Sequence, residues 1–116
     1  MNIFHIVSKS EWEKAKKAGS YEPASLKNEG FIHFSKTDQL LGVANSFYKG
    51  QKDLLILKVN IEKLSNELKM EPPLEAPMSG MLFPHLYGPM EIEAAEGEIE
   101  FPCDSNGTFD LPKGLI

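Results

Sequence analysis

The chain has 116 residues, 41% of them hydrophobic and 25% charged, which is the composition of one ordinary globular domain. Its formal net charge of −5 argues against DNA or RNA as a partner, because an acidic surface repels phosphate backbones. The single cysteine, Cys103, excludes an intrachain disulfide, and the apolar runs are too short to span a membrane. We therefore expect one cytoplasmic domain over residues 1–116, with residues 103–116 as a peripheral tail.

The first fifty residues predict two strands and two helices. Residues 3–7 are apolar and β-branched, as in a strand, with one histidine at the centre. A helix follows, which Ser8 or Ser10 can cap, and its mixed lysines and glutamates are typical of a solvated helix face. Residues 21–26 predict a connector without regular structure. Residues 31–35 predict a second short strand, and the second helix begins after it.

The remaining chain predicts further strands. Residues 54–59 are almost entirely leucine, isoleucine and valine, which is typical of a strand buried on both faces at the centre of a sheet. Residues 68–71 predict another strand, ended by two prolines. Residues 72–84 form the longest irregular stretch, and long loops are often functional. Extended structure resumes at His85, and the alternation over residues 91–101 predicts a strand whose glutamates face solvent. The fold class is α+β.

The histidines are the strongest candidates for a chemical site. His5, His33 and His85 each lie in or beside a short predicted strand. A neutral imidazole donates and accepts hydrogen bonds, which suits it to bind ribose hydroxyls or to act as an acid or base near neutral pH. Three partly buried structural histidines are an equally good interpretation. A three-histidine zinc site is a further alternative, although no two of these histidines lie three to five residues apart.

Ser35 and Tyr87 are weaker candidates. Ser35 ends the second predicted strand, where it can face a cleft or cap the next helix. Tyr87 has an aromatic face and a hydroxyl near His85, and core packing accounts for it equally well. Cys103 has no neighbour in sequence that would activate its thiol, so we interpret it as structural.

Several segments together resemble the DUF952 family of small bacterial proteins. They are FHIVS (residues 4–8), Trp12, GFIHFS (30–35), LGVAN (41–45) and FPHLYGP (83–89). The resemblance covers roughly residues 2 to 101, and the order of the motifs is specific. No biochemical activity comes with the family name.

The resemblance implies a compact ADP-ribosyltransferase-like fold, with a split β-sheet and two main helices around a cleft that binds NAD. By this resemblance, His5 contacts the ribose on the nicotinamide side. His33 stands where related enzymes place a tyrosine that stacks on nicotinamide. His85 begins the strand that normally brings a catalytic glutamate, while Ser35 and Tyr87 complete the pocket.

This chain departs from that enzyme pattern at His85, because a neutral histidine lacks the negative charge of a glutamate. Glu91 or Glu93 could take the place of the glutamate. Related RNA 2′-phosphotransferases do without it but are rich in arginine, and this chain has none. Three hypotheses follow: an enzyme with transferase or glycohydrolase-like activity on NAD or an ADP-ribose-type substrate, a binding module for a nucleotide or metabolite, and a three-histidine metal site.

Overall fold

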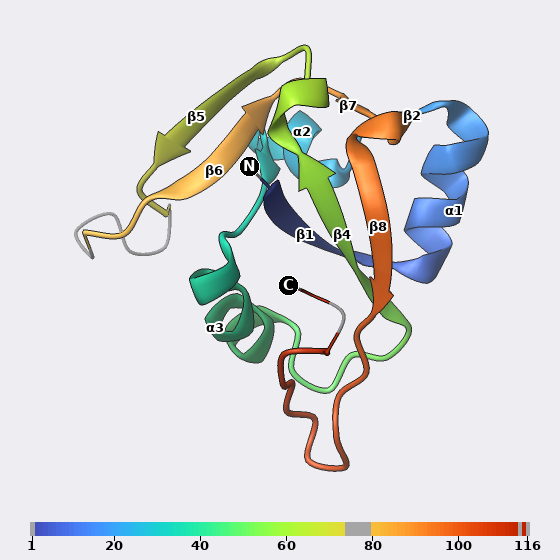
Figure 1. Cartoon of the computed structure of the whole chain (residues 1–116), viewed down its shortest axis with the longest axis vertical. Coiled ribbons are helices and arrows are strands. Elements are labelled where there is room, and N and C mark those ends of the chain that lie inside the picture. The colour runs from blue at the N-terminus through green and yellow to red at the C-terminus, as the bar shows by residue number, and fades with distance from the viewer. Residues whose placement is uncertain (1, 74–79, 114, 116) are drawn as a thin grey trace.

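The computed structural model describes residues 2–73, 80–113 and 115 (Figure 1). Residues 74–79 of the loop predicted over residues 72–84 therefore lie outside the described residues. The strands are β1 (Asn2–Ser8), β2 (Ser20–Tyr21), β3 (Ile32–His33), β4 (Leu54–Asn60), β5 (Glu67–Glu71), β6 (Phe83–Tyr87), β7 (Met90–Glu91) and β8 (Ala95–Glu100). The helices are α1 (Lys9–Ala18), α2 (Ala24–Glu29) and α3 (Thr37–Phe47), with single 3-10 turns at Ile61–Lys63 and Ile92–Ala94.

The strands form three antiparallel sheets. The central sheet has the order β1-β4-β8, and β4 lies in its middle with Ile56 and Leu57 fully buried. The prediction that residues 54–59 form the central strand is confirmed. A second sheet, here called the hairpin sheet, has the order β3-β6-β5, and β2 pairs with β7 in the third. The backbone bridge between Phe4 and Ser35 joins the edge of the central sheet to the end of β3.

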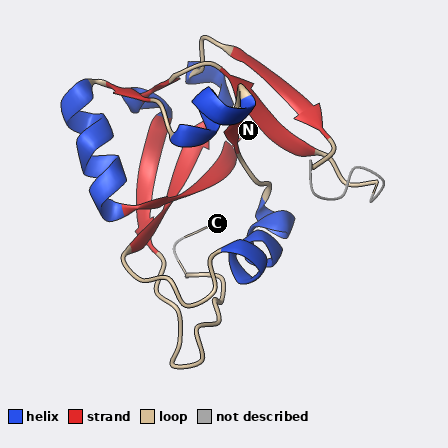
Figure 2. Ribbon diagram, turned by 180° about the vertical axis from the view of Figure 1, so that it is seen from behind, coloured by secondary structure: helices blue, strands red, loops and turns tan. Residues whose placement is uncertain are grey.

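Alternate residues of β1 enter two different hydrophobic clusters, because successive side chains of a strand point to opposite faces. Ile3 and Val7 pack in the first cluster, with Trp12 of α1 and residues of the hairpin sheet. Phe4 and Ile6 pack in the second, with side chains of α3. Figure 2 shows α1 and α3 at opposite sides of the central sheet. The predicted α+β class is thus confirmed, although the strands lie in three sheets and a short third helix accompanies the two main ones.

The boundaries of α1 follow the predicted capping chemistry. Ser8 Oγ accepts a hydrogen bond from the Glu11 amide at 3.2 Å, and Gly19 ends the helix with a left-handed φ of 86°. No helix in the part of the chain that the structure describes has the length and apolarity to cross a membrane.

Three predictions for other segments are wrong in detail. The connector predicted over residues 21–26 contains the first half of α2, a helix of six residues with no buried side chain. The single strand predicted over residues 91–101 is divided by a 3-10 turn between β7 and β8. The last residues are not wholly peripheral, because Phe109 and Leu115 are buried in the second cluster.

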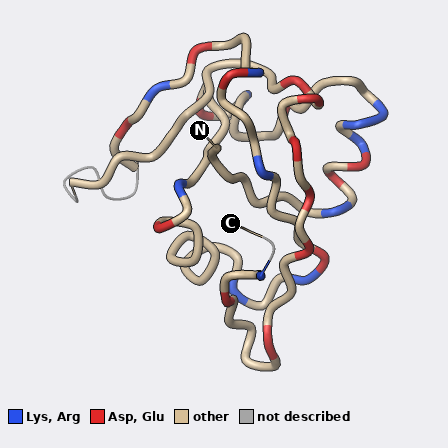
Figure 3. Tube along the Cα trace, viewed as in Figure 1, with Lys and Arg blue, Asp and Glu red and all other residues tan. Residues whose placement is uncertain are grey.

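The charged residues of α1 and β8 lie at the surface, as predicted. Figure 3 shows lysines and acidic residues interleaved along α1. Lys9 pairs with Glu100 of β8 at 2.7 Å, and Lys16 pairs with Glu98 at 3.4 Å. Such exposed pairs contribute little to stability, so the packed clusters rather than the ion pairs hold α1 against the sheet.

Candidate functional site: a histidine-lined cleft

The three histidines line one cleft of about 430 Å³. His33 of β3 and His85 of β6 are direct partners in the antiparallel register, so their side chains emerge on the same face of the hairpin sheet. The bridge from Phe4 to Ser35 brings the neighbouring His5 of β1 to the same place. The structure therefore brings together the three histidines predicted from the sequence, although it does not test their chemical roles.

His5 is buried, and both of its ring nitrogens are occupied. Nδ1 lies 2.5 Å from the backbone carbonyl of His33, and Nε2 lies 2.6 Å from the hydroxyl of Tyr21. A carbonyl only accepts, so Nδ1 carries the proton and Tyr21 donates to Nε2. Burial lowers the pKa of His5 from 6.5 to about 4, and it raises the pKa of Tyr21. This neutral imidazole ties β1 to β3 and has no free nitrogen for a ligand.

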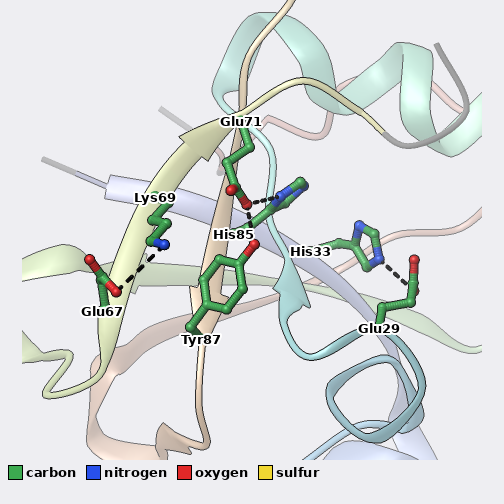
Figure 4. Close-up of polar contacts among 7 residues, drawn as sticks. All are labelled: Glu29, His33, Glu67, Lys69, Glu71, His85 and Tyr87. Carbon is green, nitrogen blue, oxygen red and sulfur yellow. Dashed lines mark hydrogen bonds and ion pairs between the residues drawn. The ribbon is translucent and has the colours of Figure 1, made fainter. Parts of the chain in front are cut away.

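His33 and His85 are arranged differently, because each has one ring nitrogen bonded to a carboxylate. Nε2 of His33 donates to Glu29 Oε1 at 2.9 Å, and Nδ1 of His85 donates to Glu71 Oε1 at 3.0 Å (Figure 4). The side chain of His33 is 40% exposed, whereas that of His85 is 3% exposed. The other nitrogen of each ring has no hydrogen-bond partner within the described part of the chain.

Aromatic contacts hold the His85 ring in place. The ring of Phe31 stacks on His85 with centroids 4.0 Å apart and an interplanar angle of 20°. Phe31 also makes an edge contact with His33. A ring packed in this way has few alternative rotamers, so the position of its nitrogens is fixed before any ligand arrives.

The two weaker candidates occupy different places. Ser35 is buried and lines the cleft, and no described residue makes a hydrogen bond with its hydroxyl. Tyr87 does not line the cleft, and its hydroxyl donates to Glu71 Oε1 at 2.5 Å. The hydrogen bonds from Tyr87 and His85 lower the pKa of Glu71, and the bond to Glu71 raises the pKa of Tyr87.

The carboxylates near the histidines are not those suggested by the enzyme resemblance. Glu91 and Glu93 are absent from the residues that line the cleft, and Glu91 accepts a hydrogen bond from the Ser65 amide instead. The sequence analysis missed Glu29 and Glu71. Glu29 lies only four residues before His33, and this short spacing could have indicated that the two side chains meet. Glu71 becomes a neighbour of His85 only through the register of β5 against β6.

The geometry gives no support to a three-histidine metal site. Among the described residues, no three His, Cys, Asp or Glu side chains are placed to hold a metal ion together. In addition, His5 would have to give up one of its two hydrogen bonds in order to coordinate a metal.

Fold and site together define a small α+β domain with three antiparallel sheets and a cleft lined by histidine and aromatic side chains. The family described as "Protein of unknown function (DUF952)" matches residues 6–97. This match covers well over half of the chain, so the protein belongs to that family, as its motifs predicted.

Solved structures of a protein from Caulobacter crescentus, CC0527, are similar to this chain. One crystal structure superposes with a TM-score of 0.86 at 34% sequence identity and covers 99% of this chain and 98% of that chain. The solution NMR structure of CC0527 gives a TM-score of 0.70 at 32% identity, over 91% of this chain and 89% of that chain. No curated protein matches the chain. These similarities support the fold and the family, and none of the matched descriptions states an activity.

Proposed function

We propose that this chain binds a nucleotide of the NAD or ADP-ribose type in the histidine-lined cleft, with the nucleoside part of the ligand against the histidines. The observation that carries this proposal is the convergence of His5, His33 and His85 from three strands in one cleft. Of these, His33 and His85 each have a ring nitrogen that no described residue satisfies. Convergent polar groups among apolar side chains in one cleft are typical of small-molecule sites.

The size and lining of the cleft suit a nucleoside. A volume of about 430 Å³ lies in the range of small-molecule pockets. Five phenylalanine and tyrosine side chains line the cleft and suit contact with a planar ring: Tyr21, Phe34, Phe47, Tyr48 and Phe83. In contrast, no lysine or arginine is among the described residues that line it, while Glu11 is. A diphosphate would find no positive charge there, so we place the phosphates of such a ligand outside the cleft.

The resemblance to ADP-ribosyltransferase-like proteins supplies the nucleotide class in this proposal. It also suggests a reaction, namely transfer or hydrolysis at the bond between ribose and nicotinamide. The alternative is a module that binds a nucleotide or metabolite without turnover. Release of nicotinamide from NAD, followed by chromatography, separates these two possibilities.

Binding is tested first, by titrating the protein with NAD and with ADP-ribose while the ring signals of the histidines are followed by NMR. All three histidines line the cleft, so every histidine ring reports on it directly. We expect saturable shifts of the His33 and His85 signals. No shift at millimolar ligand would contradict the proposal.

A pair of serine variants gives a matched control. Ser35→Ala removes a hydroxyl that lines the cleft, whereas Ser65→Ala removes an exposed hydroxyl away from it. One lost hydrogen bond corresponds to about 0.5–1.5 kcal/mol, so Ser35→Ala should weaken binding roughly twofold to tenfold. Ser65→Ala should leave the affinity unchanged, and equal affinities for both variants would remove Ser35 from the site.

A further inference from the structure

The carboxylates bonded to His33 and His85 determine what these rings present to the cleft. Glu29 bonds Nε2 of His33 and Glu71 bonds Nδ1 of His85, and Figure 4 shows the two carboxylates on opposite sides of the two rings. A carboxylate only accepts hydrogen bonds, so the bonded nitrogen carries the proton. In a neutral imidazole the other nitrogen is then an acceptor. The free nitrogens are Nδ1 of His33 and Nε2 of His85.

These two acceptors belong to neighbouring rings that both line the cleft. The ring centroids of His33 and His85 are 5.3 Å apart, and both residues line the cleft. No described residue donates to either free nitrogen, although the His85 side chain is 97% buried. A ligand that brings two hydrogen-bond donors can therefore bond to both nitrogens.

The acceptor on His85 is held in position from two sides. The Phe31 ring stacks on the imidazole, and Glu71 accepts a hydrogen bond from its Nδ1. The Tyr87 hydroxyl donates to the same Glu71 oxygen at 2.5 Å and thereby orients the carboxylate. A carboxylate that orients a histidine through one nitrogen, so that the other nitrogen can act, is a recurring arrangement in protein sites.

We infer that Nδ1 of His33 and Nε2 of His85 accept hydrogen bonds from two neighbouring hydroxyls of the ligand, such as the cis-diol of a ribose. Glu29 and Glu71 act as positioning residues that hold the two rings in the accepting form. This inference rests on the proposed function and narrows it, because it assigns the part of the nucleotide that meets these histidines. An anionic group at this position would meet acceptors only.

The accepting forms are tested without a ligand. Long-range ¹H–¹⁵N NMR spectra at pH 8.5, where an ordinary imidazole is neutral, report which ring nitrogen carries the proton. We expect the proton on Nδ1 of His85 and on Nε2 of His33. The opposite form of either ring in the wild-type protein would overturn the inference.

Three variants separate the role of Glu71 from a merely structural one. Glu71→Ala should move the proton of His85 toward Nε2, because the acceptor for Nδ1 is removed. Glu71→Gln should restore the wild-type spectrum, because an amide oxygen has two lone pairs and can accept from both His85 and Tyr87. Glu67→Ala, an exposed site on the same strand, should leave His85 unchanged. An unchanged His85 spectrum in Glu71→Ala would overturn the role of Glu71.

The diol is tested with matched nucleosides. Adenosine and nicotinamide riboside are each compared with the 2′,3′-dideoxy counterpart by NMR titration. We expect the diol form of at least one pair to bind at least tenfold more tightly, and we expect this preference to fall in Glu71→Ala but not in Glu67→Ala. Equal binding of both members in the cleft would refute the inference and leave the proposed function standing. Binding by none of the four nucleosides, together with no shift in the titrations with NAD and ADP-ribose, would refute both.

Discussion

The buried imidazole of His5 makes a quantitative prediction about stability and pH. Its pKa is about 4 in the folded protein because burial penalises the charged form, against an ordinary value of 6.5. The unfolded chain therefore binds a proton at a higher pH than the folded chain does. Consequently, the contribution of neutral His5 is complete above about pH 6.5 and is lost as the pH falls toward 4.

The size of the effect follows from the two pKa values. The interval from 6.5 to about 4 corresponds to about 3 kcal/mol in the free energy of unfolding at pH 4. At pH 5.5 the same linkage predicts a loss of about 1–2 kcal/mol relative to pH 8. A typical domain of this size is stable by only about 5–15 kcal/mol, so the change is large enough to measure.

Urea unfolding of the wild type and of His5→Gln at pH 8, 5.5 and 4 measures this contribution. Glutamine can still donate to a carbonyl and accept from Tyr21, but it does not titrate. The two proteins differ only at residue 5, so the comparison isolates this side chain. We expect the wild type to lose about 3 kcal/mol more than His5→Gln between pH 8 and pH 4. The same pH dependence in both proteins would refute the reasoning.

Three further changes test the packing around the site, each by urea unfolding at pH 8. Asn45→Ala removes the side chain that donates to the Phe109 carbonyl and accepts from its amide. We expect the free energy of unfolding to fall by about 1–3 kcal/mol. An unchanged midpoint would show that the C-terminal segment is not anchored there. Ser8→Ala removes the N-cap of α1 and should cost about 1 kcal/mol, while Ser8→Gly should cost less. Gly88→Ala places a Cβ 2.4 Å from the Asn66 side chain at a φ of 153° and should destabilise by more than about 1 kcal/mol. A comparable loss in Gly97→Ala, where the nearest atom would lie at 3.5 Å, would contradict this steric explanation.

Local patterns in the sequence were sufficient to predict several elements. The apolar run at residues 54–59 predicted the central strand, and a cap at Ser8 or Ser10 predicted the start of α1. The helix α2 was not predictable in this way, because its six residues follow a proline and bury no side chain. It therefore lacks the apolar stripe by which a surface helix is recognised.

The histidines of the cleft could be chosen from the sequence, but their different environments could not. His5 and His33 lie in similar short strands as predicted from the sequence. In the structure, however, the ring of His5 is buried with both nitrogens bonded, whereas the ring of His33 is partly exposed. These differences arise from contacts between residues distant in sequence, such as His5 with Tyr21 and His85 with Glu71. A register between two strands separated by a long loop is not fixed by the pattern of either strand.

The order β1-β4-β8 has a consequence for synthesis of the protein. Each neighbouring pair in this sheet joins segments that lie tens of residues apart in the chain, as do β3 and β6, which place His33 opposite His85. Non-local pairings of this kind form late, because the loop between the partners must close first. A nascent chain that has not yet reached Tyr87 lacks a complete β6, the strand that pairs with both β3 and β5. The cleft is therefore assembled only after about three quarters of the chain has been made, and fragments that end earlier should fail to form it.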